Sequence, residues 1–142
     1  MTQYDLLRQH IASICPLSDS EWDYVAQHFS YRKLRKHQFL VQKGEMVPCE
    51  FWIIKGLVKT YAIDCDGKEH ILQFAMEEYW TSDFQAFQNQ VPACMYMDCI
   101  EDSEVYSISF ENLNFLCSQM PKMEHPCQYI TSIKKSQFAC RW

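Results

Sequence analysis

Apolar residues at helical spacing open the chain. Leu7, Ile11 and Ile14 recur every three or four positions, which is the period of one face of an α-helix. Pro16 then interrupts the pattern, because proline cannot continue a helix. The beginning of the chain is therefore predicted to form a short amphipathic helix followed by a turn.

A second predicted helix begins with a capping box. The Ser18 side chain can accept a hydrogen bond from the backbone at position 21, and the Glu21 side chain can reach back to the backbone of Ser18. Leu17 and Trp22 supply the apolar pair of a hydrophobic staple at the same boundary. The stripe that this helix is expected to bury consists of Trp22, Val25, Ala26 and Phe29.

Short β-rich runs replace the helical pattern over 31–109. They follow one another at the spacing of an all-β barrel or sandwich. Asp66 and Gly67 stand between two runs and predict a hairpin, because the turn needs a positive φ that glycine accepts without a Cβ clash. The predicted strands lie at 38–41, 51–54, 57–63, 69–75, 95–100 and 104–108.

Helical spacing returns after residue 109. Leu113 and Leu116 predict a short helix that Pro121 ends, and a longer helix is predicted from Lys122 to Trp142. One face of the longer helix carries Met123, Cys127, Ile130 and Ile133. The pattern allows this face to pack against either of two partners: the chain's own barrel, or a second copy of the same helix. The prediction carried forward is a homodimer through the C-terminal helix.

These elements form one predicted domain over 1–142, of the mainly β class with flanking helices (α+β). It divides into N-terminal helices at 1–30, a β-barrel at 31–109 and C-terminal helices at 110–142. The chain has 142 residues, of which 48% are hydrophobic and 15% aromatic, with three glycines and five prolines. This is the composition of a compact domain and not of a linker.

The charge balance argues against nucleic acid as a partner of this chain alone. The formal net charge is -5 at pH 7, whereas binding to a phosphate backbone needs clustered lysine and arginine. One basic run is interpreted as the solvated edge of a strand: Arg32, Lys33, Arg35, Lys36 and His37. No stretch approaches the ~20 consecutive apolar residues of a membrane helix, so no membrane association is expected.

The eight cysteines are dispersed along the chain. No basic segment followed by an apolar run opens the sequence, so a secretory signal peptide is not predicted. Without one, the cysteines are interpreted as reduced thiols that serve mostly as small core residues. A cytoplasmic protein is therefore expected.

Catalytic and metal-binding patterns find no support. A cupin-type metal enzyme needs several His and acidic ligands converging in the barrel, but the five histidines are scattered and only His70 lies in a predicted strand. An iron-sulfur cluster held by N-terminal cysteines is disfavoured because only Cys15 lies in that region. Neither a nucleophile elbow nor a phosphate loop is present. The chain is predicted not to be an enzyme and to hold no cofactor or metal.

Three predicted strands with a glycine near one end resemble segments of a known family. The segments 44–45, 51–58 and 66–69 each contain one glycine next to a predicted strand. Their order and spacing resemble the sensor domain of the catabolite-activator and fumarate-nitrate-reduction (Crp/Fnr) transcriptional regulators. The resemblance extends from about Leu17 to the end of the chain. It implies a double-stranded β-helix, or jelly-roll barrel, with N-terminal helices and a C-terminal dimerisation helix.

The resemblance also implies a ligand site. In the family, a phosphate-binding cassette reads Phe-Gly-Glu-Leu and, after a loop, Arg-Ser-Ala or Arg-Thr-Ala. The corresponding segments here are 81–84 and 93–95, so Ser82 takes the glycine place, Asp83 the ribose-binding carboxylate place and Ala93 the phosphate-binding arginine place. The implied ligand-binding residues are Ser82, Asp83, Phe84, Ala93, Cys94 and Met95.

The departures from this cassette weaken the expected phosphate binding. Asp83 can still accept hydrogen bonds from a diol, but Ala93 offers no cation where arginine would form two charged hydrogen bonds. At ~1.5–3 kcal/mol for each bond, the loss is roughly two or more orders of magnitude in affinity. Ser82 adds a side chain where backbone amides would approach the phosphate. A neutral or weakly polar effector, or an empty pocket, is predicted.

Three functions remain open at this point. The first is a ligand-sensing regulatory domain with weak or no binding of cyclic nucleotides. The second is a degenerate domain that serves dimerisation or partner binding, and the third is a metal enzyme. In the family a winged-helix DNA-binding domain follows, whereas this chain ends at Trp142. The chain is therefore either a fragment of a longer regulator or a sensor module on its own.

Overall fold

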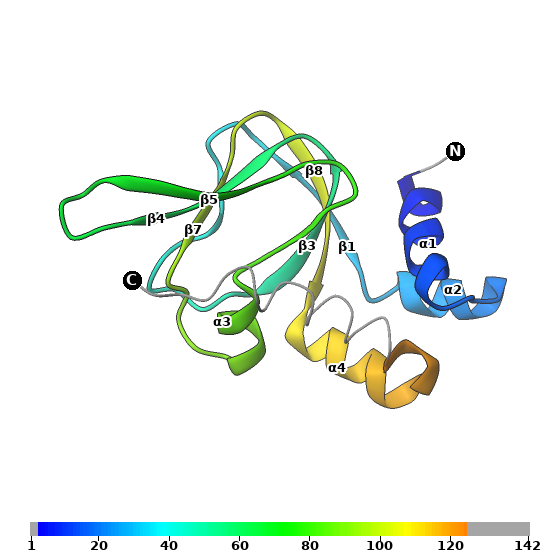
Figure 1. Cartoon of the computed structure of the whole chain (residues 1–142). Coiled ribbons are helices and arrows are strands. Elements are labelled where there is room, and N and C mark those ends of the chain that lie inside the picture. Colours follow the sequence, from blue (N-terminus) through cyan, green and yellow to red (C-terminus); the bar gives the residue numbers. More distant parts are fainter. Residues whose placement is uncertain (1–2, 125–142) are drawn as a thin grey trace.

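The computed structural model describes residues 3–124. Within them it has four α-helices, a short 3-10 helix and eight strands (Figure 1). The helices are α1 Gln3–Ile14, α2 Asp19–Ala26, α3 Phe84–Asn89, α4 Phe110–Gln119 and the 3-10 helix η1 Pro121–Met123. The strands are β1 Ser30–Leu34, β2 Phe39–Val41, β3 Cys49–Lys55, β4 Val58–Ile63, β5 Glu69–Ala75, β6 Trp80–Thr81, β7 Tyr96–Cys99 and β8 Ser103–Ser109.

Two antiparallel sheets form the barrel, one in the order β1-β8-β3-β6 and the other in the order β2-β7-β4-β5. Ile53 pairs with Val105 in the first sheet and Val58 with Cys99 in the second, and all four residues are fully buried. Alternate residues of a strand point to opposite faces, so these residues form the core between the sheets. The predicted mainly β fold with flanking helices is confirmed.

The β4–β5 hairpin projects from one end of the barrel, opposite to α1 and α2 (Figure 1). Its turn has the predicted residues: Gly67 has a φ of 81°, and one Asp64 carboxylate oxygen accepts the backbone N–H groups of Asp66 and Lys68. β5 is an edge strand that exposes Ile71, Leu72 and Phe74 to solvent, and Met76, directly after the strand, is exposed as well.

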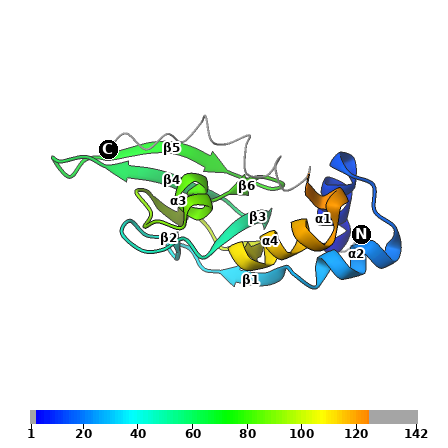
Figure 2. The ribbon, with the colours of Figure 1, turned by 90° about the horizontal axis from the view of Figure 1, so that it is seen from below.

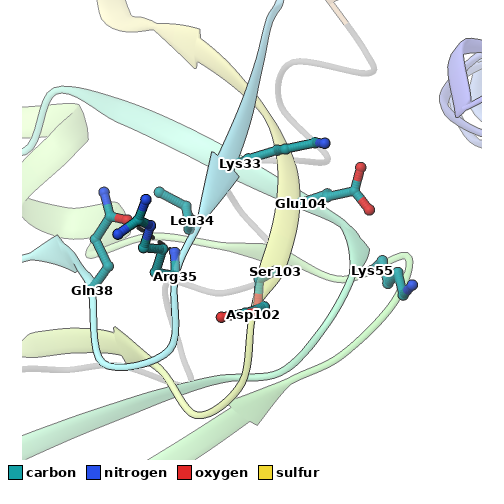
Figure 3. Close-up of a pocket in the computed structure, with 8 residues that line it drawn as sticks. All are labelled: Lys33, Leu34, Arg35, Gln38, Lys55, Asp102, Ser103 and Glu104. Atoms are coloured by element: carbon teal, nitrogen blue, oxygen red, sulfur yellow. Dashed lines mark hydrogen bonds between the residues drawn. The ribbon is translucent and has the colours of Figure 1, made fainter.

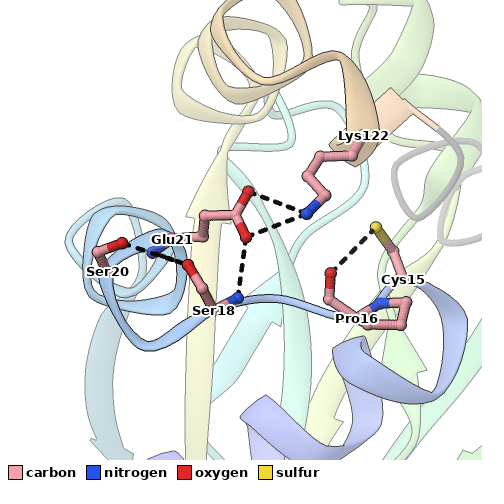
Figure 4. Close-up of polar contacts among 6 residues, drawn as sticks. All are labelled: Cys15, Pro16, Ser18, Ser20, Glu21 and Lys122. Carbon is pink, nitrogen blue, oxygen red and sulfur yellow. Dashed lines mark hydrogen bonds and ion pairs between the residues drawn. The ribbon is translucent and has the colours of Figure 1, made fainter.

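The capping box of α2 forms as predicted (Figure 4). The Glu21 backbone N–H donates to the Ser18 hydroxyl at 3.2 Å, and the Ser18 backbone N–H donates to the Glu21 carboxylate at 2.9 Å. Lys122 of η1 also donates to both carboxylate oxygens of Glu21 at 3.0 Å. These bonds lower the pKa of Glu21, mainly through the Ser18 backbone and then through Lys122. The cap thereby joins the N-terminal helices to the segment after α4.

Helices α3 and α4 lie on the same side of the sheets, below them in Figure 1 and toward the viewer in Figure 2. The rings of Phe87 in α3 and Phe110 in α4 pack edge to face at 5.6 Å. The sequence did not predict α3 or the two-residue strand β6, because both are short and have no clear period. The helix predicted from Lys122 to Trp142 lies mostly outside the described residues.

Candidate functional site

The predicted cassette is the connection between β6 and β7, and it contains α3. Asp83 is the N-cap of α3, and Gln90 ends the helix in the left-handed conformation with a φ of 53°. The chain then passes through residues 92–95 to reach β7. The structure therefore brings the two halves of the cassette, 81–84 and 93–95, next to each other.

Asp83 joins these two halves by hydrogen bonds. One carboxylate oxygen accepts the backbone N–H of Ala86 at 3.2 Å, and the other accepts the backbone N–H of Cys94 at 3.0 Å. The side chain is 1% exposed. A carboxylate placed to bind a sugar diol would point at least one oxygen toward the ligand. In this chain both oxygens bind the protein's own backbone.

The Ser82 side chain and the Ala93 backbone also form hydrogen bonds within the protein. The Ser82 hydroxyl donates to the Cys49 carbonyl of β3 at 3.0 Å, so it points at the sheet. The Ala93 backbone N–H donates to the Glu45 carbonyl, and the Ala93 carbonyl accepts the Gly44 N–H, both at 2.8 Å. Ser82 and Ala93 are both buried. The loop at 44–45 therefore lies beside the place where the family has its phosphate-binding arginine and pairs with its backbone.

The other three predicted residues differ in exposure. Phe84 and Met95 lie in the hydrophobic core, each 1% exposed, whereas Cys94 is only partly buried. Cys94 lines a cavity of about 260 Å³ outside α3, together with Gln85, Ala86, Asn89, Val91 and Pro92. Of the six predicted residues, Cys94 alone faces this cavity, which offers a small ligand a mostly apolar surface.

A larger cavity, of about 630 Å³, lies at the junction of β1, β3 and β8 (Figure 3). Lys33 and Lys55 flank Glu104 in register across the three strands. The cavity is lined by Lys33, Leu34, Arg35, Gln38, Lys55, Asp102, Ser103 and Glu104. Its three cationic side chains and two carboxylates nearly balance, and it contains none of the predicted site residues. The basic run at 32–37 shows two of these cationic residues in the sequence. The sequence could not show the cavity, because β1, β3 and β8 come together only in the fold.

The described residues offer little support for a metal or nucleophilic site. No group of three His, Cys, Asp or Glu side chains within residues 3–124 is placed to hold a metal ion. The His70 ring lies 2.7 Å from an Asp64 carboxylate oxygen, and this hydrogen bond lowers the pKa of Asp64. Burial raises the pKa of the Cys49 thiol, which keeps it protonated at neutral pH. No helix in the described part of the chain has the length and apolarity to cross a membrane.

The cysteines only partly follow the sequence interpretation. Cys15, Cys49, Cys65 and Cys99 are free thiols. Cys94 and Cys117, however, are both disulfide-bonded, which departs from the expectation that all the cysteines are reduced. The sequence could not show this, because disulfide bonding depends on how close the sulfur atoms lie in the fold.

Comparison with known proteins identifies the family to which this chain belongs. The sequence model described as "Cyclic nucleotide-binding domain" matches residues 31–120, which is more than half of the chain. The chain belongs to the cyclic nucleotide-binding domain family. The match runs from β1 to the end of α4 and includes the whole cassette. The resemblance to Crp/Fnr sensor domains is thereby confirmed.

Individual relatives agree with the family. The anaerobic regulatory protein of Pasteurella multocida is 29% identical over 134 residues, which cover 89% of this chain and 48% of the relative. The domain therefore spans about half the length of this curated relative. The sensor domain of the transcriptional regulator DNR from Pseudomonas aeruginosa has a TM-score of 0.70 at 18% identity, covering 96% of this chain and 94% of that one. A cyclic nucleotide-binding domain from Methylobacillus flagellatus has a TM-score of 0.77 at 13% identity, covering 92% and 74%.

Proposed function

We propose that this chain is the ligand-sensing domain of a cytoplasmic Crp/Fnr-type transcriptional regulator that binds cyclic nucleotides weakly or not at all. The family supports the sensing role, and the relative from Pasteurella multocida is named as a regulatory protein. The engagement of Asp83 supports the altered specificity. Each of its carboxylate oxygens already accepts a backbone hydrogen bond and the residue is 1% exposed, so a ribose could reach it only if the surrounding chain moved.

The position of Ala93 supports the same proposal. A cyclic phosphate in the family's cassette meets an arginine, but here it would meet a buried methyl group next to the Asp83 carboxylate. Without a cation, the anion pays its desolvation cost and also meets like-charge repulsion. A neutral or weakly polar effector fits this environment better than a phosphate does.

Calorimetry with cyclic AMP and cyclic GMP tests this specificity. At neutral pH, both are expected to bind with a Kd weaker than about 100 μM, because the phosphate anchor is absent. A protein known to bind cyclic AMP, measured in the same buffer, serves as the positive control. Low-micromolar binding by the unmodified chain would overturn the proposal.

The double variant Ala93→Arg with Ser82→Gly separates two explanations of weak binding. If the cassette lacks only its anchor, restoring the family residues should make cyclic AMP binding stronger by about ten-fold or more. If the double variant folds but gains no affinity, the missing anchor is not what prevents binding, and the buried cassette does not admit the ligand. That result would favour the second candidate function.

The second candidate is an interaction domain that has lost its ligand. The exposed apolar side chains of β5 favour it, because an exposed apolar group of this kind often marks a contact with another protein. In both candidates we propose that the chain forms a homodimer through the predicted helix from Lys122 to Trp142. Neither candidate requires a catalytic residue.

Light scattering tests the homodimer. The chain is expected to show twice the monomer mass, and Ile130→Asp is expected to shift it toward the monomer, because a buried carboxylate would disrupt the apolar stripe. Ser132→Asp, in the same predicted helix but off the stripe, is the matched control and should remain dimeric. A monomer at high micromolar concentration, or a dimer that Ile130→Asp leaves intact, would contradict the prediction.

A further inference from the structure

A polar contact within an aromatic cluster links helix α1 to the outer face of a sheet. The Trp80 indole N–H of β6 donates to Nε2 of His10 in α1 at 2.8 Å. The His10 ring also packs against the rings of Trp52 and Trp80, with centroids 5.9 and 6.0 Å away. Trp80 is 4% exposed, whereas His10 is partly accessible to solvent. A proton can therefore reach the histidine, while the indole has little access to water.

This hydrogen bond requires a neutral histidine. Nε2 accepts a proton from the indole only through its lone pair, so the ring must carry its own hydrogen on Nδ1. Protonation places a hydrogen on Nε2 as well, and an imidazolium has two donors and no acceptor. In the protonated form, the His10 Nε2–H and the Trp80 indole N–H would face each other as two donors. The buried indole N–H would then lose His10 as its acceptor.

The surroundings of His10 favour the neutral form. Burial lowers the pKa of His10 below its ordinary value of 6.5, and the smaller effect of Glu78, in the turn before β6, opposes this shift. On α1 itself the nearby charge is Arg8, which forms a salt bridge with Asp19 of α2 at 2.6 Å. The neighbours from the sheet are aromatic: Trp52 and Trp80, with Tyr106 stacked behind Trp52 at 6.4 Å.

The sign of the pH effect follows from these contacts. A histidine whose folded-state pKa is depressed contributes its full stability above the unfolded pKa of about 6.5, where both states are neutral. As the pH falls below 6.5, the undocked helix takes up a proton more readily than the docked one, and the stability is lost. Leu7 and Ile11 remain apolar contacts of α1, so the helix loosens without leaving the barrel completely.

We propose that the His10–Trp80 pair is a proton-operated latch, which holds α1 on the sheet at neutral pH and loosens it in mildly acidic solution. Trp80 and Thr81 form β6, and Ser82 and Asp83 follow directly, so the latch connects α1 to the strand that leads into the cassette. The inference concerns a different part of the molecule from the ligand site. It holds or fails independently of the proposed function.

Hydrogen exchange of the whole chain, resolved by NMR, tests the latch. Between pH 7.5 and pH 5, the amide protection of residues 7–14 is expected to fall about ten-fold after correction for intrinsic exchange, which is the size of effect expected from one lost hydrogen bond. The amides of β8 should keep their protection. The indole N–H resonance of Trp80, assigned with Trp80→Phe, should move with the same midpoint.

Three variants separate the latch from general acid sensitivity. His10→Gln retains an acceptor but does not titrate, so the protection of residues 7–14 should become nearly independent of pH. His28→Gln is the matched control just after α2, where the His28 ring contacts the Tyr24 carbonyl, and it should keep the wild-type profile. If His10→Gln fails to fold, Trp80→Phe removes the donor and should at least halve the pH-dependent change. An unchanged profile in His10→Gln, or equal loss of protection in β8, would overturn the proposal.

Discussion

Replacing Gly56 by alanine is expected to lower the free energy of unfolding by about 3 kcal/mol or more. Gly56 joins β3 to β4 with a φ of 115°, a conformation that strains any residue with a Cβ. A Cβ at this position would also lie 2.1 Å from the Ser103 hydroxyl and 2.8 Å from the Ser103 Cα. Because the Ser103 backbone belongs to β8, rotating its side chain cannot relieve the clash. Urea unfolding followed by tryptophan fluorescence measures the change.

Gly67→Ala is the matched control for this prediction. Gly67 also has a positive φ, of 81°, but no heavy atom lies within 4 Å of a Cβ built there. In the control only the strained backbone lowers the free energy of unfolding, by about 1–2 kcal/mol. The difference between the two variants combines the close approach of Gly56 to Ser103 with the greater strain of a φ of 115°. If Gly56→Ala costs no more than Gly67→Ala, the turn between β3 and β4 does not lie against β8 as described.

Asp83→Ala is expected to destabilise the fold by about 2–4 kcal/mol. The change removes the N-cap of α3, which is worth about 1 kcal/mol, and leaves the partly buried backbone N–H of Cys94 without its acceptor. Asp83→Asn keeps one acceptor oxygen and should cost about half as much. Chemical unfolding, with circular dichroism as the readout, compares the three proteins.

Asp19→Ala is the control for a carboxylate at the start of a helix. Asp19 is in the first turn of α2 and pairs with Arg8, but its side chain is 93% exposed, so the loss should stay below about 0.5 kcal/mol. If Asp83→Ala is as mild as this control, the carboxylate does not join the two halves of the cassette. It would then be free for a ligand, and the proposed loss of sugar binding would fail with it.

The two large effects have a common origin in the packing of distant segments. Gly56 and Ser103 are far apart in the sequence, as are Asp83 and Cys94 across the cassette loop. In each pair the side chain at one position is restricted by a backbone group at the other: the Ser103 Cα leaves no room for a Cβ at Gly56, and the Cys94 N–H needs the Asp83 carboxylate. The barrel is therefore expected to tolerate substitutions on the β4–β5 hairpin much better than at the connections between strands where distant segments pack together.

Local chemistry made a large part of the fold predictable from the sequence. The capping box of Ser18 and Glu21 forms as predicted, because its bonds join residues three positions apart. The hairpin at Asp66 and Gly67 was predictable for the same reason: one turn with positive φ fixes it. The alternation and spacing of the strands indicated the barrel. The ordered glycine-punctuated motifs placed the chain in its family.

The tertiary structure decided what the cassette residues do. The sequence aligned Asp83 with a sugar-binding carboxylate, but only the fold shows that both of its oxygens bind backbone amides. The sequence also showed Ala93 in the arginine place, but only the fold shows that its backbone pairs with the loop at 44–45. His10 and Trp80 are separated by 70 positions, so no local pattern could pair them. The roles of these groups depend on the neighbours they meet after folding, and a one-dimensional pattern encodes those neighbours only when they lie within a few residues.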